Sequence, residues 1–262
     1  MVRRAGLVAE VTEALLYPWL VRGMFAAAAI TVASVFFVTA PYGRHSRGGW
    51  GPSISTRAGW ILMESPAALV FTGVFLLGRH RDDAPALILA CVWLWHYGYR
   101  AFIYPFRLRA PEKPMPLSIA AMGSSFCAFN GYLNGRWVSE MHRYPAGWTS
   151  DPRLWGGIAL FAAGWAINQH ADAVLLGLRR PGETGYRIPV GGLYRFISCP
   201  NYFGEVLEWS GWALATWSLP GLGFALYTAA NLIPRAVDHH RWYQRTFAEY
   251  PKERRAVLPF LL

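Results

Sequence analysis

The sequence predicts an all-α membrane protein with seven transmembrane helices. Of its 262 residues, 54% are hydrophobic and only 15% are charged, a balance too apolar for an ordinary soluble domain of this length. Apolar runs of roughly 20 residues recur along the chain, and a helix of that length crosses a bilayer. Lys and Arg lie mostly in the short segments between these runs, so the net charge of +10 fits membrane topology better than nucleic acid binding. We therefore expect a lipid bilayer around the protein and no nucleic acid partner.

The apolar runs define the elements in chain order. Residues 5–18 predict an amphipathic helix, and the seven spans that follow cover about 20–40, 58–78, 84–106, 117–139, 154–178, 201–218 and 221–243. Polar, Pro-rich or Gly-rich segments separate the spans, such as the link at 111–116 and the Pro220-Gly221 turn. Because the loops are short and no internal repeat is present, residues 1–262 are expected to form one domain.

The distribution of basic residues between the loops predicts the orientation. The loops after the first, third and fifth spans, together with the C-terminal tail, hold more Lys and Arg than the other loops. The positive-inside rule then places the C-terminus in the cytoplasm and the N-terminus outside. Short loops favour a bacterial inner membrane, and a monomer is expected. The three cysteines show no paired spacing, so neither a disulfide framework nor a metal site is predicted.

Polar residues inside the fifth and sixth spans are the strongest functional signal. Asn168 and Asp172 are four residues apart, as are Asn201 and Glu205, so each pair shares one face of a helix, and Glu208 follows. Ionisable groups in hydrocarbon are costly unless they face a partner, a cavity or a ligand. The segment between these spans is rich in Gly and Arg, which suits a phosphate group. The alternative is that these side chains only hold helices together.

Three earlier spans also carry polar side chains. Glu64 lies near the start of the second span, and the run His96–Arg100 lies within the third. In the fourth span, Asn130 and Asn134 are again four residues apart. Because polar groups in a membrane need partners, we expect these side chains to contact one another or a ligand.

A long block of the sequence resembles a known family. The resemblance is to the C-terminal half of the membrane steroid 5α-reductases, and it is carried by NQHADAVLLGLRRPGETGYRIPVGGLYRFISCPNYFGEVLEWSGWALATWSLP and by RAVDHHRWYQRTFAEYPKERRAVLPFLL. It extends more weakly through PYGRHS, LMESPA and WHYGYRAFIYP. The resemblance implies a seven-helix fold that encloses NADPH and a steroid. In this family hydride passes to C5 of a 3-oxo-4-ene, and C4 is then protonated.

The resemblance also implies a catalytic pair. Glu64 and Tyr97 match the family residues that engage the C3 carbonyl of the steroid. Hydride attack at C5 leaves charge on the C3 oxygen, so a hydrogen-bond donor aimed there stabilises the transition state. Tyr97 is one such donor, and Glu64 in its protonated form is a second. The structural alternatives are an interfacial aromatic for Tyr97 and a helix-pairing carboxyl for Glu64. Met63 stands where the family commonly has Gln, which bears on substrate range.

An NADPH site is implied in the half of the chain from about residue 110 to 262. The matching residues are Asn168, Asp172, Arg179, Tyr186, Arg187, Asn201, Glu205, His239 and Tyr243, and Lys113 stands where the family has an Arg near the phosphates. Arg179 and Arg187 suit phosphate oxygens, whereas Asp172 and Glu205 suit ribose or amide groups. Asn201 also fits a helix N-cap, because Pro200-Asn201 opens the sixth span.

A second enzyme class has a related motif. The segment CPNYFGEVLEWSG also resembles the S-adenosylmethionine motif of membrane isoprenylcysteine and phospholipid methyltransferases, in which Arg-His-Pro precedes the Tyr and Gly. Here Ser198 and Cys199 replace the Arg and His, and a methyl donor of this kind has no phosphate for the Arg-rich segment to bind. A non-catalytic lipid-binding or scaffold protein is a third possibility, but it does not account for the clustered polar residues. The sequence therefore favours the reductase.

Overall fold

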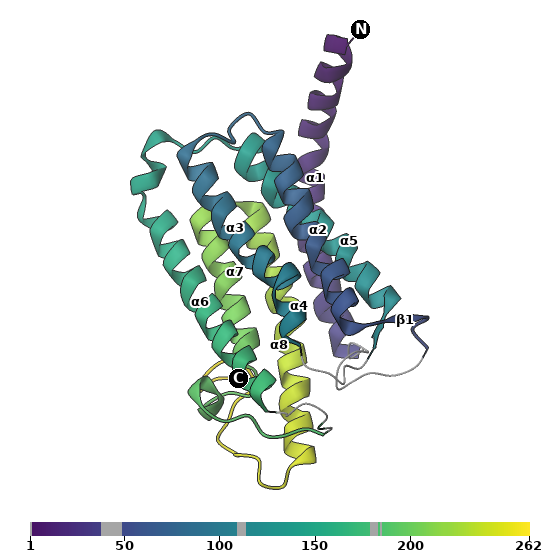
Figure 1. Cartoon of the computed structure of the whole chain (residues 1–262). Coiled ribbons are helices and arrows are strands. Elements are labelled where there is room, and N and C mark those ends of the chain that lie inside the picture. The colour runs from purple at the N-terminus through teal and green to yellow at the C-terminus, as the bar shows by residue number, and fades with distance from the viewer. Residues whose placement is uncertain (1, 38–48, 109–113, 179–182, 184) are drawn as a thin grey trace.

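Long helices form the body of the protein. The computed structural model describes residues 2–37, 49–108, 114–178, 183 and 185–262. Within these residues the long helices are α1 (Val2–Phe37), α2 (Thr56–Leu76), α3 (Ala84–Phe102), α5 (Leu117–Arg136), α6 (Pro152–Gly177), α7 (Pro200–Thr216) and α8 (Leu219–Thr246). They run roughly side by side as a bundle, and the N-terminal part of α1 projects beyond it (Figure 1).

Short elements connect the long helices. They are α4 (Tyr104–Arg107), the π-helical turn η2 (Trp137–Met141) and the 3₁₀ turns η3 (Ala146–Ser150) and η4 (Gly192–Arg195). Strand β1 (Ser53–Ile54) pairs antiparallel with β2 (Met115–Pro116), with Ser53 opposite Pro116. This pairing ties the start of α2 to the start of α5.

Each predicted span falls on a long helix, and the third continues from α3 into the short helix α4. The N-terminal prediction is wrong in one respect: α1 is a single helix from Val2 to Phe37, although Pro18 lies inside it. A proline removes one backbone hydrogen bond, but tertiary contacts hold the chain on both sides of it. At the neighbouring position, the Tyr17 hydroxyl donates to the Leu133 carbonyl at 2.7 Å. Residues 38–40 of the predicted span lie outside the described residues.

Among the described residues, three helices are long and apolar enough to cross a membrane. They cover Val11–Val35, Thr56–Leu76 and Ala84–Arg107. Several of the remaining long helices carry the polar side chains that the sequence singled out, such as Asn130 and Asn134 on α5 and Glu205 on α7, and these lower their hydropathy. The chain is therefore an all-α membrane protein, and the crossing of the membrane by all seven helices stays a prediction.

Glycines bring α6 and α7 into close backbone contact. A Cβ atom at Gly164 would lie 2.4 Å from the backbone nitrogen of Glu208, and one at Gly211 would lie 2.4 Å from that of Phe161. No side chain fits at such distances, so only glycine permits the approach. The close contact places the Asn168 face of α6 directly against α7.

Aromatic packing joins α3 to its neighbours. Trp93 is fully buried, and its indole N–H donates to the Ala67 carbonyl of α2 at 3.0 Å. Its ring also packs against Trp209 and Trp212 of α7, with centroids 5.5 and 5.0 Å away. This cluster fixes the rotation of α3 and hence the direction of the polar residues one turn further along.

The C-terminal tail, residues 247–262, folds back beneath α6 and α7 (Figure 1). The backbone nitrogens of Ser198 and Cys199 donate to the carbonyls of Arg255 and Ala256 at 2.8 and 3.1 Å. The buried Arg254 side chain also donates to the Pro189 carbonyl at 3.0 Å. The tail therefore fixes the loop that leads into α7.

The described connections lie at opposite ends of the bundle (Figure 1). The α2–α3 and α5–α6 links lie at one end, whereas β1, η4 and the C-terminal tail lie at the other. This arrangement is the one that the predicted loop assignment requires. Which end faces the cytoplasm stays a prediction.

Candidate active site

Tyr97 on α3 is buried in the bundle, with 3% of its surface exposed. Its ring packs on Trp209 of α7, with centroids 5.6 Å apart. The hydroxyl oxygen accepts a hydrogen bond of 3.4 Å from the Asn130 side-chain amide of α5. Among the described residues, no group accepts the hydroxyl proton. Tyr97 is therefore held in place while its hydroxyl proton is available for donation.

Glu64 on α2 lies near Tyr97 and is only partly buried. The Cys127 thiol of α5 donates to its Oε2 atom at 3.8 Å, and Tyr97, Glu64 and Cys127 lie close enough to interact electrostatically. Next to Glu64, Met63 packs against Gly123 of α5, where an added Cβ atom would lie 2.6 Å from the Met63 sulfur. The structure thus brings the two predicted catalytic residues together, and their roles stay a prediction.

A polar cluster surrounds Arg100, one turn along α3 from His96. The Arg100 guanidinium lies 3.4 Å from the Asp172 carboxylate of α6 and 3.9 Å from the Glu205 carboxylate of α7. It also packs over the rings of Trp60 and Tyr104, each 4.5 Å from the centroid. One cation therefore links two of the predicted cofactor residues and joins α3 to the glycine-packed pair of helices.

Amide side chains complete this cluster. The Asn168 side chain donates to the Asn201 carbonyl at 3.0 Å, and the Asn201 side chain donates to Asp172 at 3.3 Å. Helix α7 begins at Pro200 with Cys199 at the N-cap, so Asn201 lies inside the first turn. The interpretation of Asn201 as a helix cap is therefore wrong. Its side chain instead connects α7 to α6.

A buried pair lies one turn away on α3. The His96 Nδ1 atom lies 2.6 Å from the Glu208 Oε1 atom of α7, and both side chains are buried. The imidazole also packs against Trp209, with centroids 4.6 Å apart. His96 and Arg100 thus both contact carboxylates on α7, as their spacing on one face of α3 requires.

Three of the other predicted cofactor residues, Tyr186, His239 and Tyr243, lie around the end of α8. The Tyr202 hydroxyl lies 3.1 Å from the His239 Nε2 atom, the Tyr186 ring packs against Trp242, and Tyr243 stacks on Tyr250 with centroids 5.2 Å apart. Arg187 pairs with Glu183 at 3.0 Å and is largely exposed. Lys113 and Arg179 lie outside the described residues.

Comparison with known proteins shows the family. The family described as 3-oxo-5-alpha-steroid 4-dehydrogenase matches residues 113–262. The chain is 44% identical over 239 residues to steroid 5-alpha-reductase DET2 of Gossypium hirsutum, covering 88% of this chain and 92% of that protein. It is 45% identical over 222 residues to 3-oxo-5-alpha-steroid 4-dehydrogenase 1 of Macaca fascicularis, covering 84% of each chain.

The chain belongs to the steroid 5α-reductase family. It is therefore an oxidoreductase of this family, and the methyltransferase alternative is not favoured. The human 3-oxo-5-alpha-steroid 4-dehydrogenase 1 is 44% identical over 222 residues, covering 84% of this chain and 85% of the human protein. Since these relatives come from a plant and from mammals, they do not support the prediction of a bacterial inner membrane.

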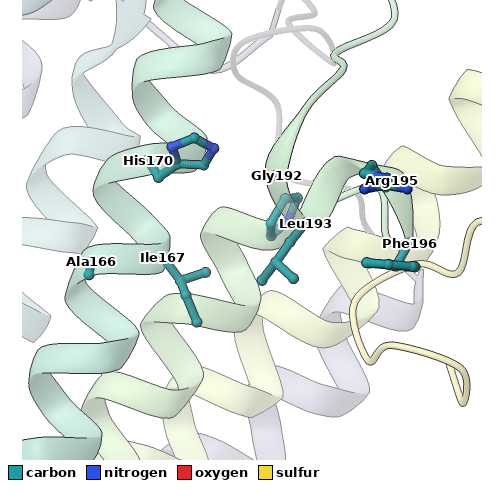
Figure 2. A pocket seen from close by; sticks show the side chains of 8 residues that line it. Ala166, Ile167, His170, Gly192, Leu193, Arg195 and Phe196 are labelled. Atoms are coloured by element: carbon teal, nitrogen blue, oxygen red, sulfur yellow. The ribbon is translucent and has the colours of Figure 1, made fainter.

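A surface pocket of this reductase lies between α6 and η4 (Figure 2). It has a volume of about 450 Å³ and is lined by Ala166, Ile167, His170, Gly192, Leu193, Arg195, Phe196 and Pro200. None of the predicted site residues lines it. Gly192 faces His170 so closely that an added Cβ atom would lie 2.4 Å from the imidazole. An enclosed cavity for cofactor and steroid stays a prediction.

Two residues that contact the candidate site were not assigned to it from the sequence. Arg100 and Asn130 contact predicted site residues, yet the sequence placed neither in the site. A signal was present for both, because each lies in an apolar span, four residues from another polar residue on the same helix face. Only the partner on another helix shows which such pairs belong to the site.

Proposed function

We propose that this protein uses NADPH to reduce the 4,5 double bond of 3-oxo-4-ene steroids to 5α-dihydrosteroids. The family and the names of its relatives support the reaction class. The observation that carries the proposal is the Tyr97 hydroxyl, which is buried, held by Asn130, and has no acceptor for its proton among the described residues. A buried hydroxyl whose proton is not taken by a neighbour is the kind of donor that this reaction needs.

The chemistry assigns a role to each catalytic residue. Adding hydride to C5 of the enone moves negative charge onto the C3 oxygen, and C4 then takes up a proton. The Tyr97 hydroxyl donates to the C3 oxygen and stabilises this charge, as donors of an oxyanion hole do. Glu64 in its protonated form donates to the same oxygen from α2. The low dielectric around both residues strengthens these hydrogen bonds.

The polar residues of α6 and α7 fit NADPH, which supplies the hydride when it is bound. Asn168, Asp172, Asn201 and Glu205 offer amide and carboxylate groups that suit ribose hydroxyls and a carboxamide. The Arg187 guanidinium is accessible for phosphate, which would replace its contact with Glu183. By resemblance, Lys113, Arg179, Tyr186, His239 and Tyr243 belong to the same site.

The membrane arrangement follows from the same proposal. All seven long helices cross the bilayer as a monomer, with the C-terminal tail and the Arg-rich segment in the cytoplasm, where NADPH is found. An apolar steroid partitions into lipid and enters between helices. Single cysteines at the exposed positions Gly147 and Lys252, in a Cys91→Ala background, test the sidedness in oriented vesicles. Labelling of Lys252→Cys only from the outside would show that the topology is the inverse of the proposed one.

Product analysis tests the reaction itself. The purified protein is incubated with NADPH and testosterone or progesterone, and the product is identified by mass spectrometry and by comparison with 5α and 5β standards. We expect the 5α-dihydrosteroid. Conversion of S-adenosylmethionine without steroid reduction would support the methyltransferase instead.

Tyr97→Phe tests the catalytic assignment. We expect kcat to fall by about 10²-fold or more, the scale of removing one oxyanion donor, while the affinity for NADPH changes little. Glu64→Gln keeps a donor and should retain more activity than Glu64→Ala. Equal losses of turnover and of NADPH affinity in Tyr97→Phe would contradict the role of Tyr97.

A further inference from the structure

We propose that Trp212, Asn134 and Asn130 form a hydrogen-bond chain of fixed direction that keeps the Tyr97 hydroxyl a donor toward the substrate. This inference rests on the proposed function, because it explains how the proposed donor is oriented. The three residues are positioning residues, since none of them is assigned a contact with the substrate.

The chain runs through the core from α7 to α3. The Trp212 indole N–H donates to Asn134 Oδ1 at 2.7 Å, and the Asn134 amide donates to Asn130 Oδ1 at 2.8 Å. The Asn130 amide then donates to the Tyr97 hydroxyl at 3.4 Å, the longest of the three links. Trp212, Asn134 and Asn130 are 0%, 1% and 0% exposed. Water therefore does not reach these groups to offer other partners.

The orientation of Asn134 is fixed from two sides. An indole N–H can only donate, so the group of Asn134 that faces Trp212 must be its oxygen. A backbone carbonyl can only accept, and the Asn134 amide nitrogen lies 3.1 Å from the Asn130 carbonyl oxygen. Turning the Asn134 amide over would oppose donor to donor at Trp212 and acceptor to acceptor at Asn130.

This orientation passes on to Asn130 and Tyr97. Because the Asn134 nitrogen faces the side chain of Asn130, that side chain must present its oxygen to Asn134. Its nitrogen is then left facing the Tyr97 hydroxyl oxygen. If Asn130 were turned over, its oxygen would accept the Tyr97 proton and remove the donor from the site. Trp212 on α7 thus fixes, through two side-chain amides, the orientation in which Asn130 does not accept the Tyr97 proton.

The chain also affects the strength of the donor. A hydroxyl that accepts one hydrogen bond is polarised and donates more strongly, and linked bonds in a low dielectric reinforce each other. The charge that builds up on the C3 oxygen in the transition state is stabilised by this donor. The chain is therefore expected to act on kcat more than on the binding of the steroid.

The first test removes the link to Tyr97. Asn130→Leu is close in volume and has no hydrogen-bonding group. We expect kcat to fall about tenfold, the order for one lost hydrogen bond, with KM for the steroid and the affinity for NADPH within about twofold. In a Tyr97→Phe background, the same substitution should change kcat by less than about twofold, because the hydroxyl it acts through is absent.

The second test acts at the far end of the chain, where no contact with Tyr97 exists. Trp212→Phe keeps a large aromatic ring but removes the donor that fixes Asn134, so we expect kcat to fall about threefold through the same route. Trp148→Phe is the matched control. Trp148 is also buried, but its indole N–H has no hydrogen-bond partner among the described residues. This control should leave kcat unchanged.

The outcomes separate this inference from the proposed function. Absence of a 5α product from the wild type, or full activity of Tyr97→Phe, would overturn the proposed function. If the wild type is active and Tyr97→Phe is impaired, equal losses for Asn130→Leu in both backgrounds would show a structural role and overturn the hydrogen-bond chain. Unchanged kcat in Asn130→Leu, or equal effects of Trp212→Phe and Trp148→Phe, would also overturn it. Thermal unfolding of each variant is measured alongside.

Discussion

Gly164→Ala should separate the two helices that carry much of the candidate site. A Cβ atom at position 164 would lie 2.4 Å from the Glu208 backbone nitrogen and 2.5 Å from the Gly204 carbonyl oxygen. Both are backbone atoms, so no side-chain rotation can relieve the clash. The helices α6 and α7 must move apart, or the chain must unfold locally.

The structure sets the size of the effect. Ordinary contact begins near 3.4 Å, so relief needs a separation of about 1 Å. The same movement would stretch the hydrogen bond between the Asn168 side chain and the Asn201 carbonyl from 3.0 Å to about 4 Å, where it no longer holds. Overpacking costs about 1–3 kcal/mol and the lost bond about 1 kcal/mol, so the free energy of unfolding should fall by about 2–4 kcal/mol.

Thermal unfolding and NADPH titration of the purified protein measure this effect. Gly156→Ala is the control, because a Cβ atom at that position of the same helix would meet only Leu214, at 4.0 Å. It should leave the melting temperature unchanged or slightly higher, since alanine favours helix. Gly164→Ala should lower both the melting temperature and the affinity for NADPH.

Equal melting temperatures for the two glycine variants would refute the reasoning, because they would show that close backbone approach does not hold α6 against α7. A lower melting temperature with unchanged NADPH affinity would retain the packing argument. It would show, however, that this packing does not affect the binding of NADPH.

Three further predictions follow from charged residues. Arg100→Gln leaves the buried Asp172 carboxylate and the partly buried Glu205 carboxylate without their cation and should destabilise the fold by about 3–5 kcal/mol, with partial recovery of the melting temperature on adding Asp172→Asn. Arg187→Ala should weaken NADPH binding by about 1.5–3 kcal/mol in a titration, the cost of a charge-assisted hydrogen bond, and leave the affinity for steroid unchanged. Burial opposes ionisation of Glu140, but the hydrogen bonds from Arg79 outweigh it and hold the Glu140 pKa below its usual value of 4.5. Because the pKa is lower in the folded state, this pair stabilises the fold above about pH 4.5, and its contribution is lost as the pH falls further. The difference in melting temperature between the wild type and Glu140→Gln should therefore disappear in acid.

The sequence by itself determined where the helices lie. Each span was predicted from the length and hydropathy of an apolar run, and both are local properties that survive any arrangement of the helices. The third span, about 84–106, corresponds to α3 and α4 together, and the fifth, about 154–178, corresponds to α6. The exception is α1, which continues through Pro18 because tertiary contacts outweigh one missing hydrogen bond.

The sequence also indicated which polar residues need partners. Asn168, Asp172, Asn201 and Glu205 were selected because charges and amides in apolar runs are costly. The structure brings all four into one cluster, but with a cation that the sequence had not placed there, Arg100. Spacing of four residues shows which side chains share a face, but it does not show which helix that face meets.

Only the tertiary structure decided those pairings. The rotation of each helix is set by contacts between distant segments, such as the glycines that hold α6 on α7 and the Trp93 ring that joins α3 to α2 and α7. The link from Asn134 on α5 to Trp212 on α7 depends on the rotations of α5 and α7 together. A hydrogen bond forms only within about 3.5 Å and with the right polarity, so it exists only after packing has fixed the positions of both partners.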